Sequence, residues 1–266
     1  MTDWKTGTAG IGGPKKVPYI RFGTGAKHFV ILPGVSAEPL LASAAAVARQ
    51  YEDFGTEYTV TLIDRTDPLR EGVTVGDMAD DAAAAMLCMG ITQAYVFGAS
   101  QGGMIAMLLA ARYPHLVRAL AIGSSAAYIP PESGGTMDGW ASFAESGDTL
   151  GLTRAFCGRL YSPETVRALL PQADALAAGV SPAGCRRFLV QTKACIGFDV
   201  RDELKYVRCP ALALVPEEDR VIPAGAQCET ARLLRAETVV LPGAAHAAYD
   251  EIPDYPARLK RFFDRR

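Results

Sequence analysis

Residues 94–112 read AYVFGASQGGMIAMLLAAR, and the pattern G-x-S-x-G lies near their centre, from Gly98 to Gly102. The apolar run before the pattern is typical of a buried strand, and the residues after Gly103 are typical of a helix. A serine between a strand and a helix sits in a tight turn that needs small neighbours, and the glycines provide them. The stretch therefore predicts Ser100 as a nucleophile. The alternative is a glycine-rich turn whose serine has no chemical role.

A serine hydroxyl needs a base to take its proton. The chain has three histidines, at positions 28, 115 and 246. His246 ends the segment LPGAAH, which follows the last predicted strand, and ligand sites of open α/β sheets form at the carboxyl ends of strands. His28 begins an early strand and His115 lies in a surface-like turn, so we expect structural roles for both. We therefore predict His246 as the base.

The orienting acid should follow a strand that lies between the serine and the histidine in the sequence. The segment VPEEDRVIP, residues 215–223, has this position. We predict Asp219 as the acid that accepts the second ring N–H of His246 and fixes its tautomer. Glu217 and Glu218 are the other candidates for the acid. The alternative for both is that they are charged residues of a solvated loop with no catalytic role.

An oxyanion hole needs two backbone N–H groups that point at the developing charge. The first should come from Gln101, directly after the nucleophile. The second should come from the loop after an early strand, which reads PGVS at residues 33–36. Pro33 has no N–H, so we predict Val35 as the second donor.

Strand and helix patterns alternate along most of the chain, which predicts a doubly wound, mostly parallel α/β sheet. An antiparallel edge is possible near residues 16–22. The predicted strands are 28–32, 58–63, 94–97, 119–122, 211–215 and 238–241, and the predicted helices are 38–52, 75–89, 102–112, 224–235 and 254–264.

One region, from about 128 to 207, lacks a convincing strand pattern. It opens with a Pro/Gly-rich loop at 129–135, and helical patches follow at 138–145, 149–160, 163–178 and 182–196. Ser162-Pro163 and Ser181-Pro182 are typical helix starts. We predict a first part of the core at 1–127, a helical cap at 128–207 and a second part of the core at 208–266.

Composition excludes several classes of protein. Hydrophobic residues make up 49% and charged residues 21% of the chain, as in ordinary soluble domains. The net charge of −2 predicts no basic face for nucleic acid. Residues 1–13 lack the apolar segment of a secretory signal, and no run of about 18 apolar residues suggests a membrane span. We therefore expect a cytoplasmic location and no membrane partner.

No cofactor or metal ion is expected. The six cysteines form no CxxC pair and no zinc-ligand cluster, and the predicted reducing compartment favours free thiols. The chain contains neither a phosphate loop nor a dinucleotide fingerprint. The expected partner is a small-molecule substrate, and the sequence leaves the oligomeric state open.

Four segments in order make the chain resemble the α/β-hydrolase superfamily: Leu32-Pro33-Gly34, Gly98 to Gly103, Glu218 to Pro223, and Gly243-Ala244-Ala245-His246. The helical insertion and Cys209-Pro210-Ala211-Leu212 are similar to small capped esterases, enol-lactonase-like enzymes and C–C-bond hydrolases. Two segments depart from the family: Pro33-Gly34 replaces the frequent His-Gly, and Asp64-Arg65-Thr66-Asp67-Pro68-Leu69 replaces the frequent Asp-x-Arg-Gly-x-Gly. Serine at the nucleophile position is unlike the dehalogenases and epoxide hydrolases of the superfamily, which use aspartate there.

These observations lead to a functional expectation. We expect a serine hydrolase that cleaves a small ester, lactone or thioester through an acyl-enzyme on Ser100. C–C hydrolysis of a vinylogous diketone and acyl transfer remain alternatives with the same triad, and so does a ligand-binding protein without turnover. We predict that one or two aromatic rings of the cap contact the substrate. Trp140 and Phe143 are the candidates, because they follow Gly134-Gly135, a segment expected to be flexible.

Overall fold

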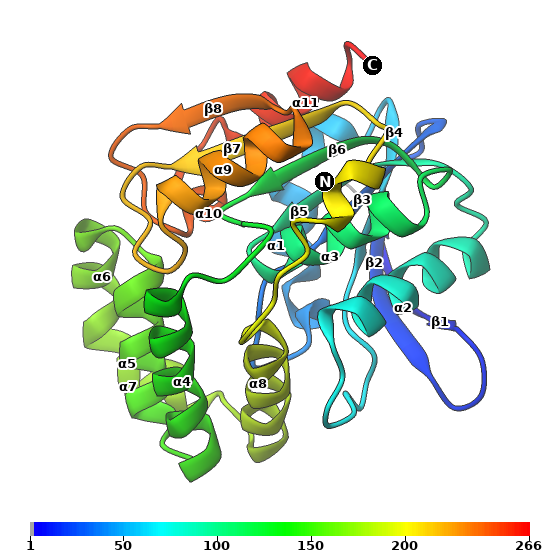
Figure 1. Ribbon diagram of the computed structural model, residues 1–266. Coiled ribbons are helices and arrows are strands. Elements are labelled where there is room, and N and C mark those ends of the chain that lie inside the picture. The colour runs from blue at the N-terminus through cyan, green and yellow to red at the C-terminus, as the bar shows by residue number, and fades with distance from the viewer. Residues whose placement is uncertain (1–2) are drawn as a thin grey trace.

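An eight-stranded sheet runs through the computed structural model, which describes residues 3–266. The strands lie in the order β1-β2-β4-β3-β5-β6-β7-β8 (Figure 1). Strands β1, β2 and β4 pair antiparallel, and all other neighbours pair parallel. The bounds are β1 Trp4–Gly10, β2 Lys16–Phe22, β3 Lys27–Leu32, β4 Tyr58–Ile63, β5 Ala94–Ala99, β6 Val117–Gly123, β7 Ala211–Pro216 and β8 Glu237–Leu241.

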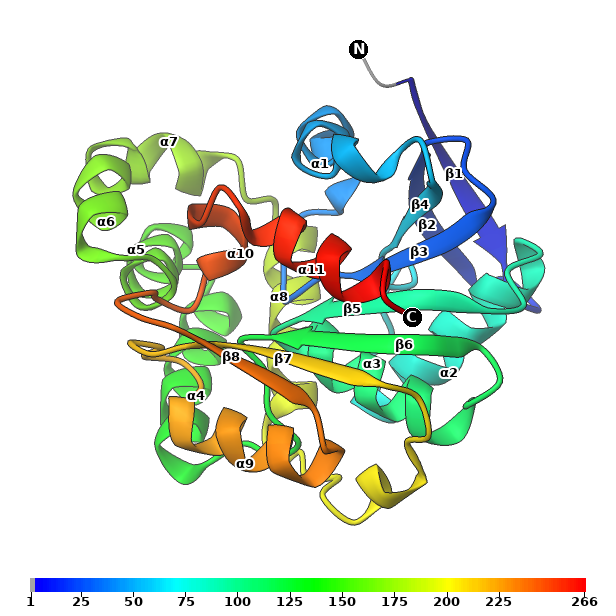
Figure 2. The same cartoon turned by 90° about the horizontal axis from the view of Figure 1, so that it is seen from above.

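Helices cover both faces of this sheet (Figure 2). One face packs against α2 (Val75–Cys88), α3 (Gln101–Arg112) and α9 (Ala224–Leu234), and the other against α1 (Ala44–Gln50) and α11 (Tyr255–Phe263). Every residue of β5 and β7 is buried, as expected for central parallel strands covered on both faces. The predicted mostly parallel doubly wound α/β fold is confirmed.

A helical layer lies at the carboxyl ends of the parallel strands, between β6 and β7 of the chain (Figure 1). It consists of α4 (Pro131–Ser146), α5 (Thr149–Leu160), α6 (Pro163–Leu169), η3 (Leu170–Gln172), α7 (Ala173–Ala178) and α8 (Pro182–Cys195). We call these helices the cap. The predicted helix starts at Ser162 and Ser181 are confirmed, because each hydroxyl accepts a hydrogen bond from the backbone N–H three residues later.

Three details of the sequence prediction are wrong. The segment Gly134-Gly135 is not a flexible loop: it lies inside α4, which begins at Pro131, a residue whose ring suits the first helical position. The helix expected over 163–178 is broken into three pieces by Pro171. The helix expected from 38 begins only after η1 (Leu40–Ser43).

The cap is tied to the core beside the loop that carries His246. The Ala247 N–H donates to the Leu160 carbonyl at the end of α5 (2.8 Å). The carboxylate of Glu251, in the short helix α10 (Ala248–Glu251), accepts hydrogen bonds from the backbone N–H and the hydroxyl of Ser162. On this side the cap cannot lift away without breaking buried or half-buried polar contacts.

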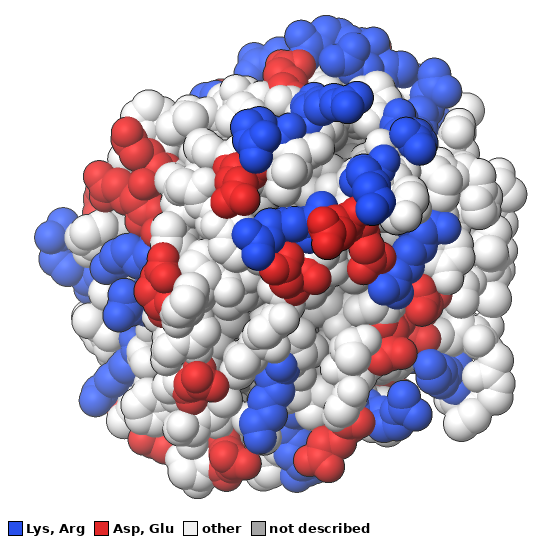
Figure 3. All heavy atoms as spheres, in the orientation of Figure 1, with Lys and Arg blue, Asp and Glu red and all other residues white. Residues whose placement is uncertain are grey.

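Charges of both signs are interspersed over the face seen in Figure 3. Within residues 3–266, no helix is long and apolar enough to cross a membrane. The described residues also contain no group of three or more His, Cys, Asp or Glu side chains placed to hold a metal ion.

Candidate active site

Ser100 occupies a strained backbone conformation between β5 and α3. Its φ of 53° and ψ of −121° lie in a region that non-glycine residues rarely adopt. The turn is tight enough that a Cβ at Gly98 would collide with the Gly102 carbonyl, and a Cβ at Gly102 with the Leu32 carbonyl. The two glycines are therefore required by close packing, and the turn projects the serine hydroxyl beyond the carboxyl end of the sheet.

The three residues predicted as a triad lie together. His246 Nε2 is 3.0 Å from Ser100 Oγ, and His246 Nδ1 is 2.8 and 2.9 Å from the two carboxylate oxygens of Asp219. His246 is 2% exposed and Asp219 is 7% exposed, so both interactions are shielded from water. Because the carboxylate accepts the Nδ1 proton, Nε2 is left as the atom that can take the proton of Ser100.

The carboxylate of Asp219 has several further donors. The backbone N–H groups of Val221 and Ile222 donate to one oxygen (2.8 and 2.9 Å), and the Gln227 amide donates to the other (2.8 Å). These bonds hold the buried charge in one orientation. The rivals Glu217 and Glu218 are exposed, and neither contacts His246 through a hydrogen bond.

Ser124 is a supporting residue that the sequence did not indicate. It follows β6 with a φ of 53°, is fully buried, and its hydroxyl donates to the His246 carbonyl (2.6 Å). This bond fixes the backbone of the histidine loop, which follows β8, from the end of β6, two strands away in the sheet. A serine at the end of a strand is too common to reveal such a role, and only the fold brings positions 124 and 246 together.

The two predicted oxyanion donors flank Ser100. Val35 lines the cavity in front of the serine, and the loop before it passes close by, since a Cβ at Gly34 would lie 3.3 Å from Ser100 Cβ. Gln101 begins α3. Among the described residues, neither the Val35 nor the Gln101 N–H has an acceptor in the protein. Two free donors beside the nucleophile suit the developing negative charge of an acyl-transfer reaction.

Arg65, in the segment that departs from the family pattern, links these two loops. Its guanidinium donates to the Pro33 carbonyl (2.6 Å) and to Gln101 Oε1 (3.0 and 3.3 Å). Gln101 Nε2 in turn donates to the Gln191 carbonyl of α8 (2.7 Å). Burial lowers the pKa of Arg65 to about 10, so the side chain stays charged at neutral pH.

The neighbouring Asp64 also ties the core to the cap. Its carboxylate accepts a hydrogen bond from Arg187 of α8 (2.6 Å), and both side chains are almost fully buried. Sequence reasoning treated residues 64–67 only as a mismatch to a pattern. Two consecutive charged residues after the buried strand β4 were the available signal.

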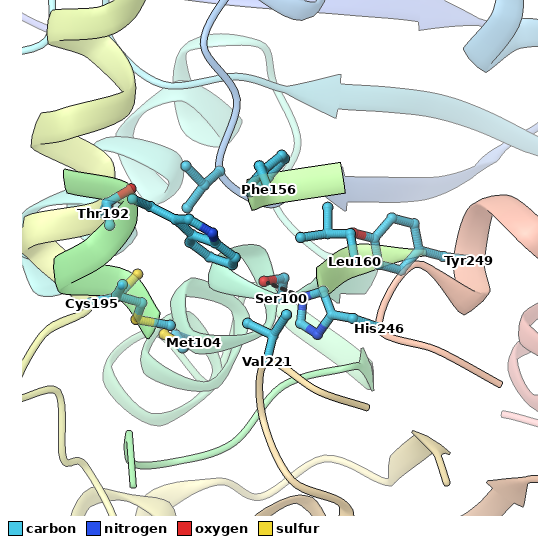
Figure 4. Close-up of a pocket in the computed structure, with 12 residues that line it drawn as sticks. Ser100, Met104, Phe156, Leu160, Thr192, Cys195, Val221, His246 and Tyr249 are labelled. Carbon is cyan, nitrogen blue, oxygen red and sulfur yellow. Dashed lines mark hydrogen bonds between the residues drawn. The ribbon is translucent and has the colours of Figure 1, made fainter. Parts of the chain in front are cut away.

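A closed pocket surrounds Ser100 and contains no exposed residue. Its volume is about 20 Å³, so the side chains around Ser100 nearly fill it. In Figure 4, Thr192 and Cys195 lie on one side of Ser100 and His246, and Leu160 and Tyr249 lie on the other. The lining is mostly apolar and consists of Val35, Ser100, Met104, Met137, Trp140, Phe156, Leu160, Thr192, Cys195, Val221, His246 and Tyr249.

Of the two predicted substrate-contacting rings, only Trp140 lines this pocket. It packs edge-on against Phe156 (centroids 4.9 Å apart), which is also a lining residue. Phe143 lies three residues along α4, does not line the pocket, and packs against Gly151 at the start of α5. The choice of Phe143 relied on the expected Gly134-Gly135 hinge, which is a helix instead.

Two polar cap residues in the closed pocket were missed. The Thr192 hydroxyl is 1% exposed and has no hydrogen-bond partner. The Cys195 thiol accepts a hydrogen bond from Gln101 Nε2 (3.2 Å), and burial raises its pKa to about 11, so it stays protonated and is no rival nucleophile. No sequence motif marks either residue, because their placement depends on which face α8 turns toward Ser100.

A second, larger cavity adjoins the first, and we call it the open chamber. It occupies about 440 Å³ and reaches solvent near Ser43, Gln50 and Asp250, which are exposed. It shares Val35, Phe156, Leu160 and Tyr249 with the closed pocket, and its other lining residues are Ile31, Pro33, Gly34, Ser36, Leu40, Ser43, Ala46, Val47, Gln50, Tyr51, Leu62, Phe97, Ala99, Tyr161 and Asp250.

The fold and this site define an α/β-hydrolase. A family model described as alpha/beta hydrolase fold matches residues 50–253. The chain belongs to this family.

The similarity to individual proteins of this family is low. The chain is 25% identical over 209 residues to 2-(acetamidomethylene)succinate hydrolase of Mesorhizobium japonicum, covering 75% of this chain and 74% of that one. Among solved structures, an α/β hydrolase from a Medee basin deep-sea metagenome library has a TM-score of 0.88 at 24% identity, with 97% of each chain covered. The enol-lactonase of Burkholderia xenovorans has a TM-score of 0.79 at 20% identity, with 94% and 96% covered. At these identities the solved structures support the fold alone.

Proposed function

We propose that this protein is a serine hydrolase that cleaves a small ester, lactone or thioester without negative charge through an acyl-enzyme on Ser100. The observation that carries the proposal is the continuous relay from Ser100 Oγ to His246 Nε2 (3.0 Å) and from His246 Nδ1 to Asp219 (2.8 Å). A nucleophile, a base and an orienting acid in hydrogen-bond contact are the parts that acyl transfer requires.

The reaction follows from these contacts. His246 Nε2 takes the hydroxyl proton as Ser100 Oγ attacks the substrate carbonyl, and Asp219 stabilises the imidazolium that forms. The carbonyl oxygen becomes an oxyanion and accepts hydrogen bonds from the N–H groups of Val35 and Gln101. His246 then gives its proton to the leaving group. Water, deprotonated by the same nitrogen, attacks the acyl carbon and releases the acid.

The lining of the two cavities supports a substrate without negative charge. Among the described residues that line them, none is Lys or Arg, and His246 is the only basic side chain. Arg65 and Arg187 lie behind the lining and are engaged with protein acceptors. A carboxylate or phosphate on the substrate would therefore be buried without a counter-charge, which is unfavourable. This speaks against acidic diketones and phosphate-bearing thioesters, so neutral esters and lactones are favoured.

The test is a labelling and activity experiment. A fluorophosphonate should label Ser100 rapidly, and hydrolysis of a panel of neutral esters and lactones should be measured beside a panel of acidic diketones. Ser100→Ala should lose labelling and about 10³-fold or more in kcat. Ser142→Ala, at an exposed position of α4 outside both cavities, serves as a serine control that keeps its labelling. Turnover of the diketones in preference to all neutral esters would contradict the proposal.

A further inference from the structure

The open chamber lies on the side of Ser100 where a leaving group must depart. His246 Nε2 has to protonate the leaving atom, so that atom must lie next to His246 while the acyl group points away from it. Leu160 and Tyr249 lie on the His246 side, and Thr192 lies on the opposite side (Figure 4). Leu160 and Tyr249 also line the open chamber. The chamber is thus the continuation of the leaving-group side.

One carboxyl group defines the chemistry of this chamber. Asp250 lines it and is the only acidic residue among the lining residues, which within the described chain include no Lys, Arg or His. Asp250 is exposed where the chamber meets solvent, and Tyr161 lines the chamber beside it. The mechanism described above makes no use of this group.

Three tyrosines, Tyr51, Tyr161 and Tyr249, line the same chamber. Aromatic faces together with a carboxylate attract ammonium groups, because the ring quadrupole and the negative charge both favour a cation. The half-buried Ser36 adds a hydroxyl oxygen that has no hydrogen-bond partner. An anionic leaving group would find no counter-charge among the lining residues.

We propose that the open chamber binds the alcohol part of the substrate and that Asp250 selects alcohols carrying a quaternary or protonated amine. The inference rests on the proposed hydrolase function and adds a substrate class to it. Ester cleavage proceeds as above: the bond between the acyl carbon and the alcohol oxygen breaks, and His246 returns the proton to that oxygen.

The kinetic test uses pairs of butyrate esters. One member carries a trimethylammonium group on an alkyl alcohol, and its neutral isostere has a tert-butyl carbon in place of the nitrogen. Over a series of alkyl lengths, kcat/KM should favour the cationic ester by about tenfold at the length that reaches Asp250. Asp250→Asn should bring this ratio close to one. Asp254→Asn, which removes an exposed carboxylate four residues later that pairs with Arg258, should leave it unchanged.

Two further measurements separate this inference from the hydrolase proposal. Methyl butyrate is too short to reach Asp250, so its hydrolysis and the fluorophosphonate labelling of Ser100 should be the same in Asp250→Asn and the parent. Binding needs no turnover, so choline and its neutral isostere should be titrated into Ser100→Ala. We expect choline to bind about tenfold tighter, and Asp250→Asn to abolish the difference. Equal binding of choline and its isostere overturns the inference, even where esters are cleaved.

Discussion

Polar groups are paired in one part of the site and unpaired in another. The first part is the surroundings of Asp219 and His246, which we call the catalytic corner, and the second is the side of the pocket formed by α8 of the cap. Around Asp219 the carboxylate oxygens receive bonds from two backbone N–H groups, from Gln227 and from His246. On α8, the Thr192 hydroxyl and two guanidinium nitrogens of Arg187 are buried without a partner. Buried polar groups are normally paired, so unpaired ones need an explanation.

The difference separates two tasks. The corner is complete in the free protein, which keeps the histidine oriented before any substrate arrives. The pocket side is incomplete, because Thr192 lines the pocket and its hydroxyl has no partner. Residues of the first kind should affect every substrate equally, whereas residues of the second kind should alter the choice among substrates.

The largest effect should come from the corner. Asp219→Asn removes the charge that orients His246 and stabilises the imidazolium, so kcat should fall by about 10²- to 10⁴-fold for all esters. Circular dichroism should show an unchanged fold. Glu218→Gln, an exposed neighbour on the same loop, is the control and should keep its full rate. If Glu218→Gln instead causes the large loss in kcat, then Asp219 is not the orienting acid.

The next effect concerns Arg65, a positioning residue that acts through the oxyanion loops. Arg65→Met leaves the Pro33 carbonyl and Gln101 Oε1 without their donor, so kcat should fall about 10- to 100-fold with little change in KM. Arg70→Met, at an exposed position of the same segment, is the matched control. If KM and kcat change in equal measure, or if only thermal stability falls, Arg65 is structural alone.

Variants of Trp140 and Phe143 test the difference between a cap residue that lines the pocket and one that does not. Trp140→Ala enlarges the closed pocket, so kcat/KM for long or branched acyl chains should change by about tenfold relative to acetate esters. Phe143→Ala removes a ring that lies outside the pocket and should lower stability without altering this ranking. The ranking is measured over an acyl series with one alcohol. Equal effects of both variants would contradict the pocket boundary described here.

Thr192 should discriminate by polarity rather than size. Thr192→Val keeps the shape of the side chain and removes its unpartnered hydroxyl. The free energy of unfolding should therefore rise by about 1 kcal/mol. Esters with an ether oxygen in the acyl chain should lose about tenfold in kcat/KM, while plain alkyl esters keep theirs. Thr192→Ser should behave like the parent. An equal loss of kcat/KM for both kinds of ester would mean that Thr192 supports catalysis in general rather than the choice of substrate.

The smallest effect is a pH dependence of leaving-group choice. Although Asp250 borders solvent, the protein atoms packed around its carboxyl desolvate it partly and raise its pKa to about 6. Above that pH the carboxylate attracts a cationic alcohol, and the attraction is lost as the pH falls through 6. The ratio of kcat/KM for cationic and neutral esters should thus decline several-fold between pH 7 and pH 5. The groups that face Asp250 are Tyr51, Tyr161, Tyr249, Tyr255, His246 and Glu251.

The ratio isolates Asp250 because protonation of His246 slows both esters alike. Burial keeps the pKa values of the four tyrosines above their usual range, so they stay neutral throughout. Asp250→Asn should make the ratio independent of pH. A parent ratio that stays constant from pH 7 to pH 5 counts against a role for this carboxyl.

Local sequence patterns predicted the nucleophile turn and the order of the triad, because both depend on residues that are close in sequence or on where strands end. The glycines around Ser100 are dictated by backbone collisions within a few residues and by one neighbouring strand, and the order of Ser100, Asp219 and His246 follows from strand ends meeting at one edge. The partners of the machinery were not predictable in this way. Ser124 bonds to a residue 122 positions away in the sequence, and Arg65 bonds to one 36 positions away. Their roles, and the role of Thr192, depend on how the strands and the cap helices pack.

The cap also shows where a plausible local argument fails. Gly134 and Gly135 suggested a hinge because glycine weakens helices. In α4 the start at Pro131 and the burial of Met137, Trp140 and Ala144 against the core outweigh that cost. Strand β1 was missed for a related reason: its only buried residue is Ala9, so it carries no apolar pattern and depends on pairing with β2.

The open chamber has a kinetic meaning as well as a chemical one. The cap is pinned at Leu160 and Ser162, beside the passage past Tyr249. Under the proposed mechanism the released alcohol leaves through this passage, and water that enters by it reaches the acyl-enzyme only after the alcohol has moved aside. A second alcohol that fits the chamber then competes with water for the same carbon. The shape of one passage thereby sets the partition between hydrolysis and transesterification, which ties the fate of each acyl group to the concentration of alcohols outside the protein.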